Sequence, residues 1–180
     1  MQVNADLTTT MQDTYELTIV ADDARFTGHA RHSGVTMRLA ARLSTYAEAY
    51  KLGSVYGPDM CYLSGPHRLT PDISFIAADR LPPEGEPDGP WRLAPDLAVE
   101  IVTANDSGDE IQCRMSSYFL AGTRQVWIVL LDSRNVHIYR SATDFVVLTD
   151  LDNLFNLEIL PGFRCRVNDL FELPAFSQVQ

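Results

Sequence analysis

A short apolar run near the middle of the chain, residues 96–102 (DLAVEIV), contains two acidic residues. The run is β-branched and apolar on both faces, which is typical of a central strand buried on both sides of a sheet. A carboxylate in such a strand is costly unless a cation, a metal or several donors neutralise it. Because side chains alternate along a strand, Asp96 and Glu100 point to the same face. The sequence therefore predicts either a divalent-metal site or a structural pairing of the buried glutamate with an arginine.

The size and composition of the chain fit one folded domain. Its 180 residues are 46% hydrophobic, and a chain of this length buries about 70% of its unfolded surface. No apolar stretch approaches the roughly 20 residues of a membrane span, and the polar residues 1–10 do not resemble a secretory signal. Cys61, Cys113 and Cys165 match neither a disulfide framework nor a zinc pattern. We therefore expect reduced thiols and a cytoplasmic protein.

The net charge is −10, and Lys51 is the one lysine among 14 Lys and Arg residues. This acidic balance lacks the overall basic character of most nucleic-acid-binding proteins. It weakens a DNA-binding interpretation without excluding it, because a metal-dependent nuclease holds carboxylates in its site and can confine its arginines to one face.

Apolar periodicity and turn residues divide the chain into elements. Residues 1–14 are a polar extension, 15–173 a single domain and 174–180 a tail. Apolar residues at three-to-four spacing predict a helix over 33–50. Ser107 followed by Glu110 is a capping box that starts a second helix over 108–121. Strands are predicted at 15–20, 54–64, 69–77, 96–102, 125–131, 135–140, 145–149, 157–160 and 163–167. This order indicates an α/β domain with one mixed sheet flanked by helices and additional C-terminal strands.

Five motifs, taken in order, resemble a known family. They are LTPDISFI at 69–76, APDLAVEIV at 94–102, YFLAG at 118–122, VWIV at 126–129 and LPGF at 160–163. Together they resemble the Uma-two family, described as putative restriction endonucleases of the PD-(D/E)XK nuclease superfamily. The resemblance implies a restriction-endonuclease-like fold and a centre that hydrolyses DNA phosphodiesters. It also implies Mg²⁺ (or Mn²⁺) as cofactor and a homodimer.

The resemblance assigns roles to three residues. Asp72 and Glu100 match the family's metal-binding carboxylates, and we expect them to lie within about 6 Å of each other. The family's lysine comes from the next helix, four residues before a tyrosine, which here makes it Arg114 before Tyr118. An arginine can hold the scissile phosphate but does not readily lose a proton. Arg114 is therefore either a phosphate ligand or a plain salt-bridge partner of Glu100.

Other acidic and basic residues leave alternatives open. Asp96 lies about 13 Å along the strand from Glu100 by rise alone, which favours a strand-start cap or a supporting role. His32 directly precedes the predicted first helix. It is either a site residue or a residue that caps or packs against the helix. Glu48 faces either the site or solvent. For the whole chain, the alternative to a Mg²⁺-dependent endonuclease is a catalytically degenerate nuclease fold that binds nucleic acid or protein.

Overall fold

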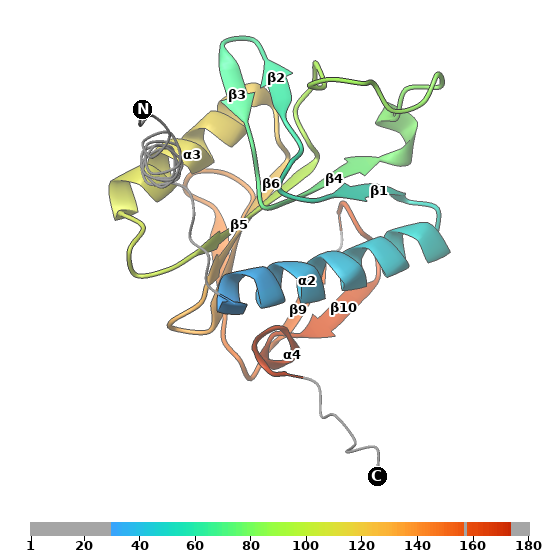
Figure 1. Ribbon diagram of the computed structural model, residues 1–180. Coiled ribbons are helices and arrows are strands. Elements are labelled where there is room, and N and C mark those ends of the chain that lie inside the picture. The colour runs from blue at the N-terminus through green and yellow to red at the C-terminus, as the bar shows by residue number, and fades with distance from the viewer. Residues whose placement is uncertain (1–29, 157, 174–180) are drawn as a thin grey trace, which may run out of the picture.

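The computed structural model describes residues 30–156 and 158–173 (Figure 1). The predicted extension (1–14), the predicted strand at 15–20 and the tail (174–180) lie outside the described residues. Within the described part, no helix is both long and apolar enough to cross a membrane.

A six-stranded mixed sheet in the order β1-β4-β5-β6-β7-β8 forms the centre of the domain. The parallel pair is β5 with β6, joined by a helical crossover, and the other neighbours are antiparallel. The predicted α/β class, with one strand–helix–strand unit among hairpins, is confirmed. The strands are β1 (Gly53–Tyr56), β4 (Ile73–Ala77), β5 (Leu97–Val102), β6 (Gln125–Leu130), β7 (Asn135–Tyr139) and β8 (Phe145–Leu148).

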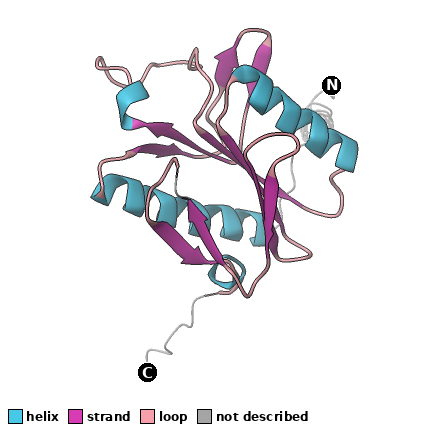
Figure 2. Ribbon diagram, turned by 180° about the vertical axis from the view of Figure 1, so that it is seen from behind, coloured by secondary structure: helices cyan, strands magenta, loops and turns pink. Residues whose placement is uncertain are grey.

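One long helix covers each face of this sheet. Figure 2 shows α2 (Ala30–Ala49) on one side and α3 (Gly108–Ala121) on the other. The alternation of the strands decides which core each side chain joins. Leu97, Val99 and Ile101 pack with α2, whereas Ala98 and Val102 pack with α3. The strand β5 is buried on both faces, as its composition predicts.

The start of α3 follows the predicted capping box. Ser107 Oγ accepts a hydrogen bond from the Glu110 amide at 3.1 Å, and the Glu110 carboxylate accepts one from the Ser107 amide at 3.3 Å. Gly122 ends the helix in the left-handed region with φ 102°. Met115 and Tyr118 are buried, while Ile111 and Phe119 are partly buried against the same core.

Several predicted boundaries were wrong. The first helix begins at Ala30, so His32 lies inside it. The predicted strand at 54–64 is β1 plus β2 (Tyr62–Ser64), because Gly57 and Pro58 break the ladder. The predicted strand at 69–77 is likewise split at Pro71 into β3 (His67–Leu69) and β4. Residues 158–160 form bends instead of a strand.

The C-terminal segment packs beside α2. A hairpin pairs β9 (Asn153–Asn156) with β10 (Phe163–Arg166), followed by the short α4 (Asn168–Phe171). Its loop turns at Pro161 and Gly162, the latter at φ 87°. The strand that pairs with β10 is β9, a segment that the sequence analysis did not predict as a strand. Tyr46 of α2 donates a hydrogen bond to the Pro161 carbonyl at 2.7 Å. The additional C-terminal strands are therefore present and fixed to α2 (Figure 1).

Candidate active site

The register of two central strands brings Asp72 and Glu100 together. Ile73 of β4 pairs with Val99 of β5, so one further step places Asp72 opposite Glu100. Directly opposed residues of an antiparallel pair project to the same face. After the larger effect of burial, the charge of Asp72 also raises the pKa of Glu100. The register therefore places both acids on one face of the sheet, and their separation within about 6 Å stays a prediction.

Glu100 is held from two sides by α3. Its side chain is buried, the residue being 7% exposed. The Tyr118 hydroxyl donates to Glu100 Oε1 at 2.5 Å, and Arg114 Nε lies 3.3 Å from Oε2. Burial, joined by the charges of Asp72 and Asp106, raises the pKa of Glu100 to about 7, although the Tyr118 hydrogen bond and Arg114 oppose the shift. Near neutral pH this carboxyl is poised between its protonated and charged forms.

Asp72 is fixed by the neighbouring strand and by the first helix. Its Oδ2 accepts a hydrogen bond from the Ile101 amide at 2.7 Å and lies 3.5 Å from His32 Nε2. The Asp72 hydrogen bond raises the pKa of His32 above its ordinary value, against partial burial. His32 therefore contacts the candidate site. The sequence analysis left the role of His32 open, because the helix predicted from residue 33 did not include it.

Asp106 is a third acid at the site, and the sequence analysis missed it. Its Oδ1 accepts from Arg114 Nη2 at 3.2 Å, and its Oδ2 accepts from the Thr103 amide at 2.9 Å and the Thr103 hydroxyl at 3.2 Å. Partial burial alone would raise the pKa of Asp106, but the hydrogen bonds from Thr103 and Arg114 outweigh it and lower the pKa. The sequence feature that could have identified Asp106 is its position one residue before the capping Ser107, where the loop turns back toward the end of β5.

Arg114 reaches the site as predicted, from the edge of the buried stripe of α3. It forms ion pairs with Glu100 and with Asp106, and its side chain is 38% exposed. The salt bridge to Glu100 that the sequence allowed is thus present. The guanidinium joins two carboxylates and still faces solvent, so one edge is accessible to an incoming anion.

Asp96 lies at the opposite end of β5 and has a different environment. It is fully buried, with Oδ1 2.8 Å from Arg80 Nη1 and 3.5 Å from Arg124 Nη1. Its Oδ2 accepts from the Ala77 amide at 2.9 Å. Two arginines therefore pair with this one acid. This arrangement agrees with a strand-start cap and places Asp96 outside the candidate site.

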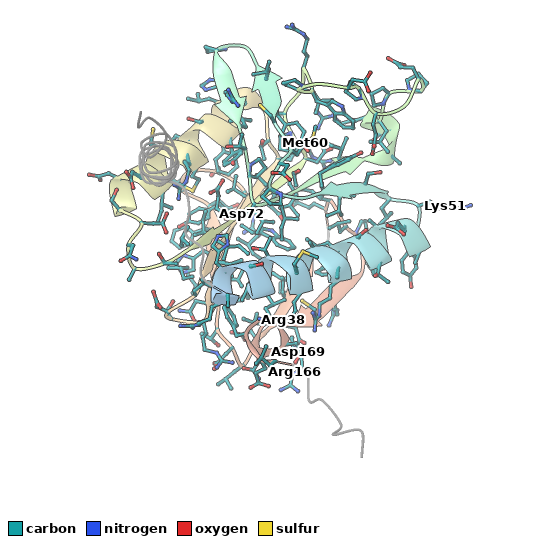
Figure 3. All side chains as sticks on the ribbon, in the orientation of Figure 1. Arg38, Lys51, Met60, Asp72, Arg166 and Asp169 are labelled. Atoms are coloured by element: carbon teal, nitrogen blue, oxygen red, sulfur yellow. The ribbon has the colours of Figure 1, made fainter. Side chains whose placement is uncertain are left out.

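Two further residues lie away from the site. Glu48 is exposed and accepts a hydrogen bond from the Ser44 hydroxyl at 2.7 Å, as expected for a solvated helix acid. Lys51 lies just beyond the C-terminal end of α2, whereas Asp72 lies near its N-terminal half (Figure 3). The chain's one lysine does not replace the lysine that the family supplies from the second helix.

A cavity of about 480 Å³ opens beside this cluster. Its walls come from the start of α2, the loop after β5 and the end of β6, and Thr103 lies both in the wall and against Asp106. The ends of the two parallel strands β5 and β6 therefore border this cavity, and Thr103 connects it to Asp106 of the cluster. The lining residues are Ala30, Arg31, Thr103, Ala104, Asn105, Leu131 and Asp132.

The donor set fits a hydrated divalent cation. Asp72 and Glu100 supply hard carboxylate oxygens, and Mg²⁺ is commonly held by one or two carboxylates plus water and phosphate oxygens. Within the described residues, no group of three or more His, Cys, Asp or Glu side chains is placed to hold a metal. Besides burial, the negative charges of Asp72 and Asp106 raise the pKa of Glu100. A cation bound between these carboxylates would offset their repulsion.

Comparisons with known proteins agree with this fold. The Anabaena variabilis structure described as a putative nuclease belonging to DUF820 matches with a TM-score of 0.71 at 20% sequence identity, over 79% of this chain and 81% of that chain. Identity this low shows a shared fold. No match was found among curated proteins. The model of the Uma2 family, described as "Putative restriction endonuclease", matches residues 20–168. The chain belongs to the Uma2 family.

Proposed function

We propose that this protein is a Mg²⁺- or Mn²⁺-dependent endonuclease that hydrolyses phosphodiester bonds in DNA. The observation that supports this most is the cluster of Asp72, Glu100 and Asp106 at one end of β5, with Arg114 and His32 as the positive partners in contact with it. Asp72 and Glu100 are the proposed metal ligands. Bound there, the cation would neutralise phosphate charge and lower the pKa of an attacking water.

The other residues position these two acids. The Ile101 amide and His32 hold Asp72, and the Tyr118 hydroxyl holds Glu100. Such supporting contacts orient ligands before substrate arrives. Arg114 contacts carboxylates through Nε and Nη2, and a guanidinium has five N–H donors. We assign its remaining donors to the scissile phosphate, where a bidentate contact stabilises developing charge.

The second candidate function is a nuclease fold without catalysis that binds nucleic acid or protein. It is favoured by one observation, the arginine at the family's lysine position. Arg114 is engaged by two carboxylates, and its guanidinium does not readily give up a proton to activate a water. A single measurement on the wild-type protein and on Arg114→Lys separates these functions.

The experiment measures cutting of supercoiled plasmid and of single-stranded DNA with Mg²⁺, with Mn²⁺ and with EDTA. We expect cutting with either metal and none with EDTA. Glu100→Gln should abolish cutting with an unchanged circular dichroism spectrum, because the amide keeps the size and removes the metal-binding charge. The matched control is Glu48→Gln, an exposed position on α2, which should cut like wild type.

Arg114→Lys gives the second readout. Faster cutting than wild type would mean that the arginine weakens a working nuclease. An absence of cutting by both proteins with both metals would instead support the binding module.

We also propose that the domain spans residues 15–173, that the protein is cytoplasmic and that it forms a homodimer. The free thiols of Cys61, Cys113 and Cys165 support a reducing compartment, and the family resemblance supports the dimer. Light scattering coupled to size exclusion should give twice the 20.1 kDa of one chain; a monomer at micromolar concentration would reject the dimer.

A further inference from the structure

The arginines of the described chain fall into two groups. One group has carboxylate partners and consists of Arg31, Arg80, Arg114, Arg124, Arg134 and Arg140. Among the described arginines without an ion pair, four come from two neighbouring elements: Arg38 and Arg42 from α2, and Arg164 and Arg166 from β10 or its end. In a chain of net charge −10, cations left without carboxylates in one place indicate an anionic partner.

Two of these arginines are fixed without being neutralised. Arg38 Nε donates to the Leu170 carbonyl at 2.7 Å, and Arg42 donates to the carbonyls of Arg38 at 2.9 Å and Asp169 at 3.4 Å. Carbonyl acceptors orient a guanidinium and leave its full charge. Arg38, Arg166 and Asp169 lie together below α2 in Figure 3. The Asp169 carboxylate is the acid that borders this region, and it forms no ion pair with a described arginine.

A hollow of about 620 Å³ lies between α2 and β10, and two of these arginines, Arg42 and Arg164, line it together with Asp169. Arg42, Tyr46 and Tyr50 line its helix side, and Phe163 and Arg164 line its strand side. We call this hollow the α2–β10 groove. Arg164 is exposed. The positive charges of Arg42 and Arg164 therefore lie at the wall of the groove.

The groove also presents aromatic rings. The centroids of Tyr46 and Tyr50 lie 4.5 Å apart, and Tyr46 meets Phe163 edge-on at 5.5 Å. Tyr50 is 64% exposed, so most of its ring is free while its partner is anchored through the Pro161 carbonyl. An anchored aromatic pair with one open ring offers a stacking surface for a planar base.

We propose that the α2–β10 groove binds a single-stranded segment of nucleic acid. The arginines would contact phosphates and Tyr50 would stack on a base, the combination that sequence-tolerant single-strand binding uses. An acidic peptide would use the charges but not the exposed ring. The inference rests on the proposed function, because it extends contact with the same nucleic acid.

The groove is within reach of a strand held at the candidate active site. His32, which contacts Asp72, and Tyr46 lie on the same helix, 14 residues apart. At 1.5 Å per residue they are separated by about 21 Å along the axis. The groove would therefore hold the strand some nucleotides from the scissile bond and set its direction across α2.

The test is fluorescence anisotropy of a labelled oligothymidylate in EDTA, where no cutting interferes. The oligonucleotide has about 20 nucleotides. At about 3.4 Å per nucleotide it is longer than the roughly 21 Å of helix that it has to cover. Arg164→Gln and Arg166→Gln should each reduce the slope of log K against log salt by about 0.7 for each phosphate that the variant no longer binds. Tyr50→Ala should weaken binding about fivefold or more. The matched control, Arg140→Gln, removes one positive charge from the β7–β8 turn, where Arg140 pairs with Asp144.

Each outcome decides the proposal. Weaker binding by the groove variants, with Arg140→Gln like wild type, supports it. Equal effects of Arg164→Gln and Arg140→Gln overturn it, as does an unchanged Tyr50→Ala together with polyglutamate binding as tight as that of the oligonucleotide. If the wild type cuts no DNA but the groove variants bind DNA more weakly, the proposed nuclease function is rejected and the binding groove is supported. If the wild type cuts DNA but the groove variants bind it as tightly as wild type, the nuclease function is supported and the groove is rejected.

Discussion

The two ends of strand β5 each bury a carboxylate, and the two acids have opposite surroundings. At the start, Asp96 is fully buried beside Arg80 and Arg124 and has the Ala77 amide as donor. At the other end, Glu100 has one arginine, one hydroxyl and two acids nearby, and burial with these acids raises its pKa to about 7.

The number of positively charged partners separates the structural acid Asp96 from Glu100, the acid proposed to be functional. Asp96 has more positive partners than it has charge, so nothing further is needed there. The cluster around Glu100 has three carboxylates against Arg114 and His32, which leaves capacity for a cation. Burial alone, which the two acids share, does not distinguish them.

The largest effect that would test this comparison is on stability. Asp96→Ala should lower the free energy of unfolding by about 3 kcal/mol, because it leaves Arg80 and Arg124 without their carboxylate partner and the Ala77 amide without its acceptor. Glu100→Gln should change it by less than about 1 kcal/mol, because it also removes repulsion from Asp72 and Asp106. Urea denaturation at pH 7 in EDTA measures both. An Asp96→Ala protein no less stable than Glu100→Gln would end the distinction.

The pH dependence of stability sharpens the comparison. The pKa of Glu100 is raised from 4.5 to about 7 in the folded state, so the folded protein binds more protons than the unfolded chain between these values. Its contribution to stability is therefore fully present below pH 4.5 and is lost as pH rises through about 7, by up to about 3 kcal/mol. The free energy of unfolding of wild type relative to Glu100→Gln should fall from pH 5 to pH 7.5. A constant difference would contradict the raised pKa.

Metal addition tests the open end of the strand directly. Mg²⁺ at about 100 times its dissociation constant should stabilise the wild type by about 2.7 kcal/mol, since it binds the folded state alone. The gain should be absent in Glu100→Gln and fully retained in Glu48→Gln. Differential scanning fluorimetry gives the Tm with and without metal. Equal stabilisation of all three proteins would place the metal elsewhere.

The smallest effect concerns the hydroxyl that holds Glu100. Tyr118→Phe should cost about 1 kcal/mol of stability, the usual net value of one hydrogen bond. The hydrogen bond from Tyr118 lowers the pKa of Glu100, so its removal should move the pH–rate profile of cutting toward alkaline pH. A purely structural role for Tyr118 would lower stability and leave the profile in place.

Much of the fold could be predicted because its signals are local. The capping box at Ser107, the stripe through Met115 and Tyr118 and the apolar run of β5 depend on residues a few positions apart. The boundaries that were wrong depend on pairing between distant segments. The partner of β10 is residues 153–156 because of the turn at Pro161 and Gly162, and the start of α2 at Ala30 lies outside the periodic pattern that marks its core.

By itself the sequence determined the α/β order and the family motifs, because both depend on residue type and spacing. Through the resemblance to the family it also nominated Asp72 and Glu100 as site acids. Only the tertiary structure decided which buried acid was already neutralised. Arg80 precedes Asp96 in the sequence and Arg124 follows it, yet both reach its carboxylate. Asp106, from the loop before α3, pairs with the same Arg114 as Glu100, and His32 of α2 contacts Asp72. Charge balance is a sum over neighbours in space, and those neighbours are fixed by strand register and helix packing.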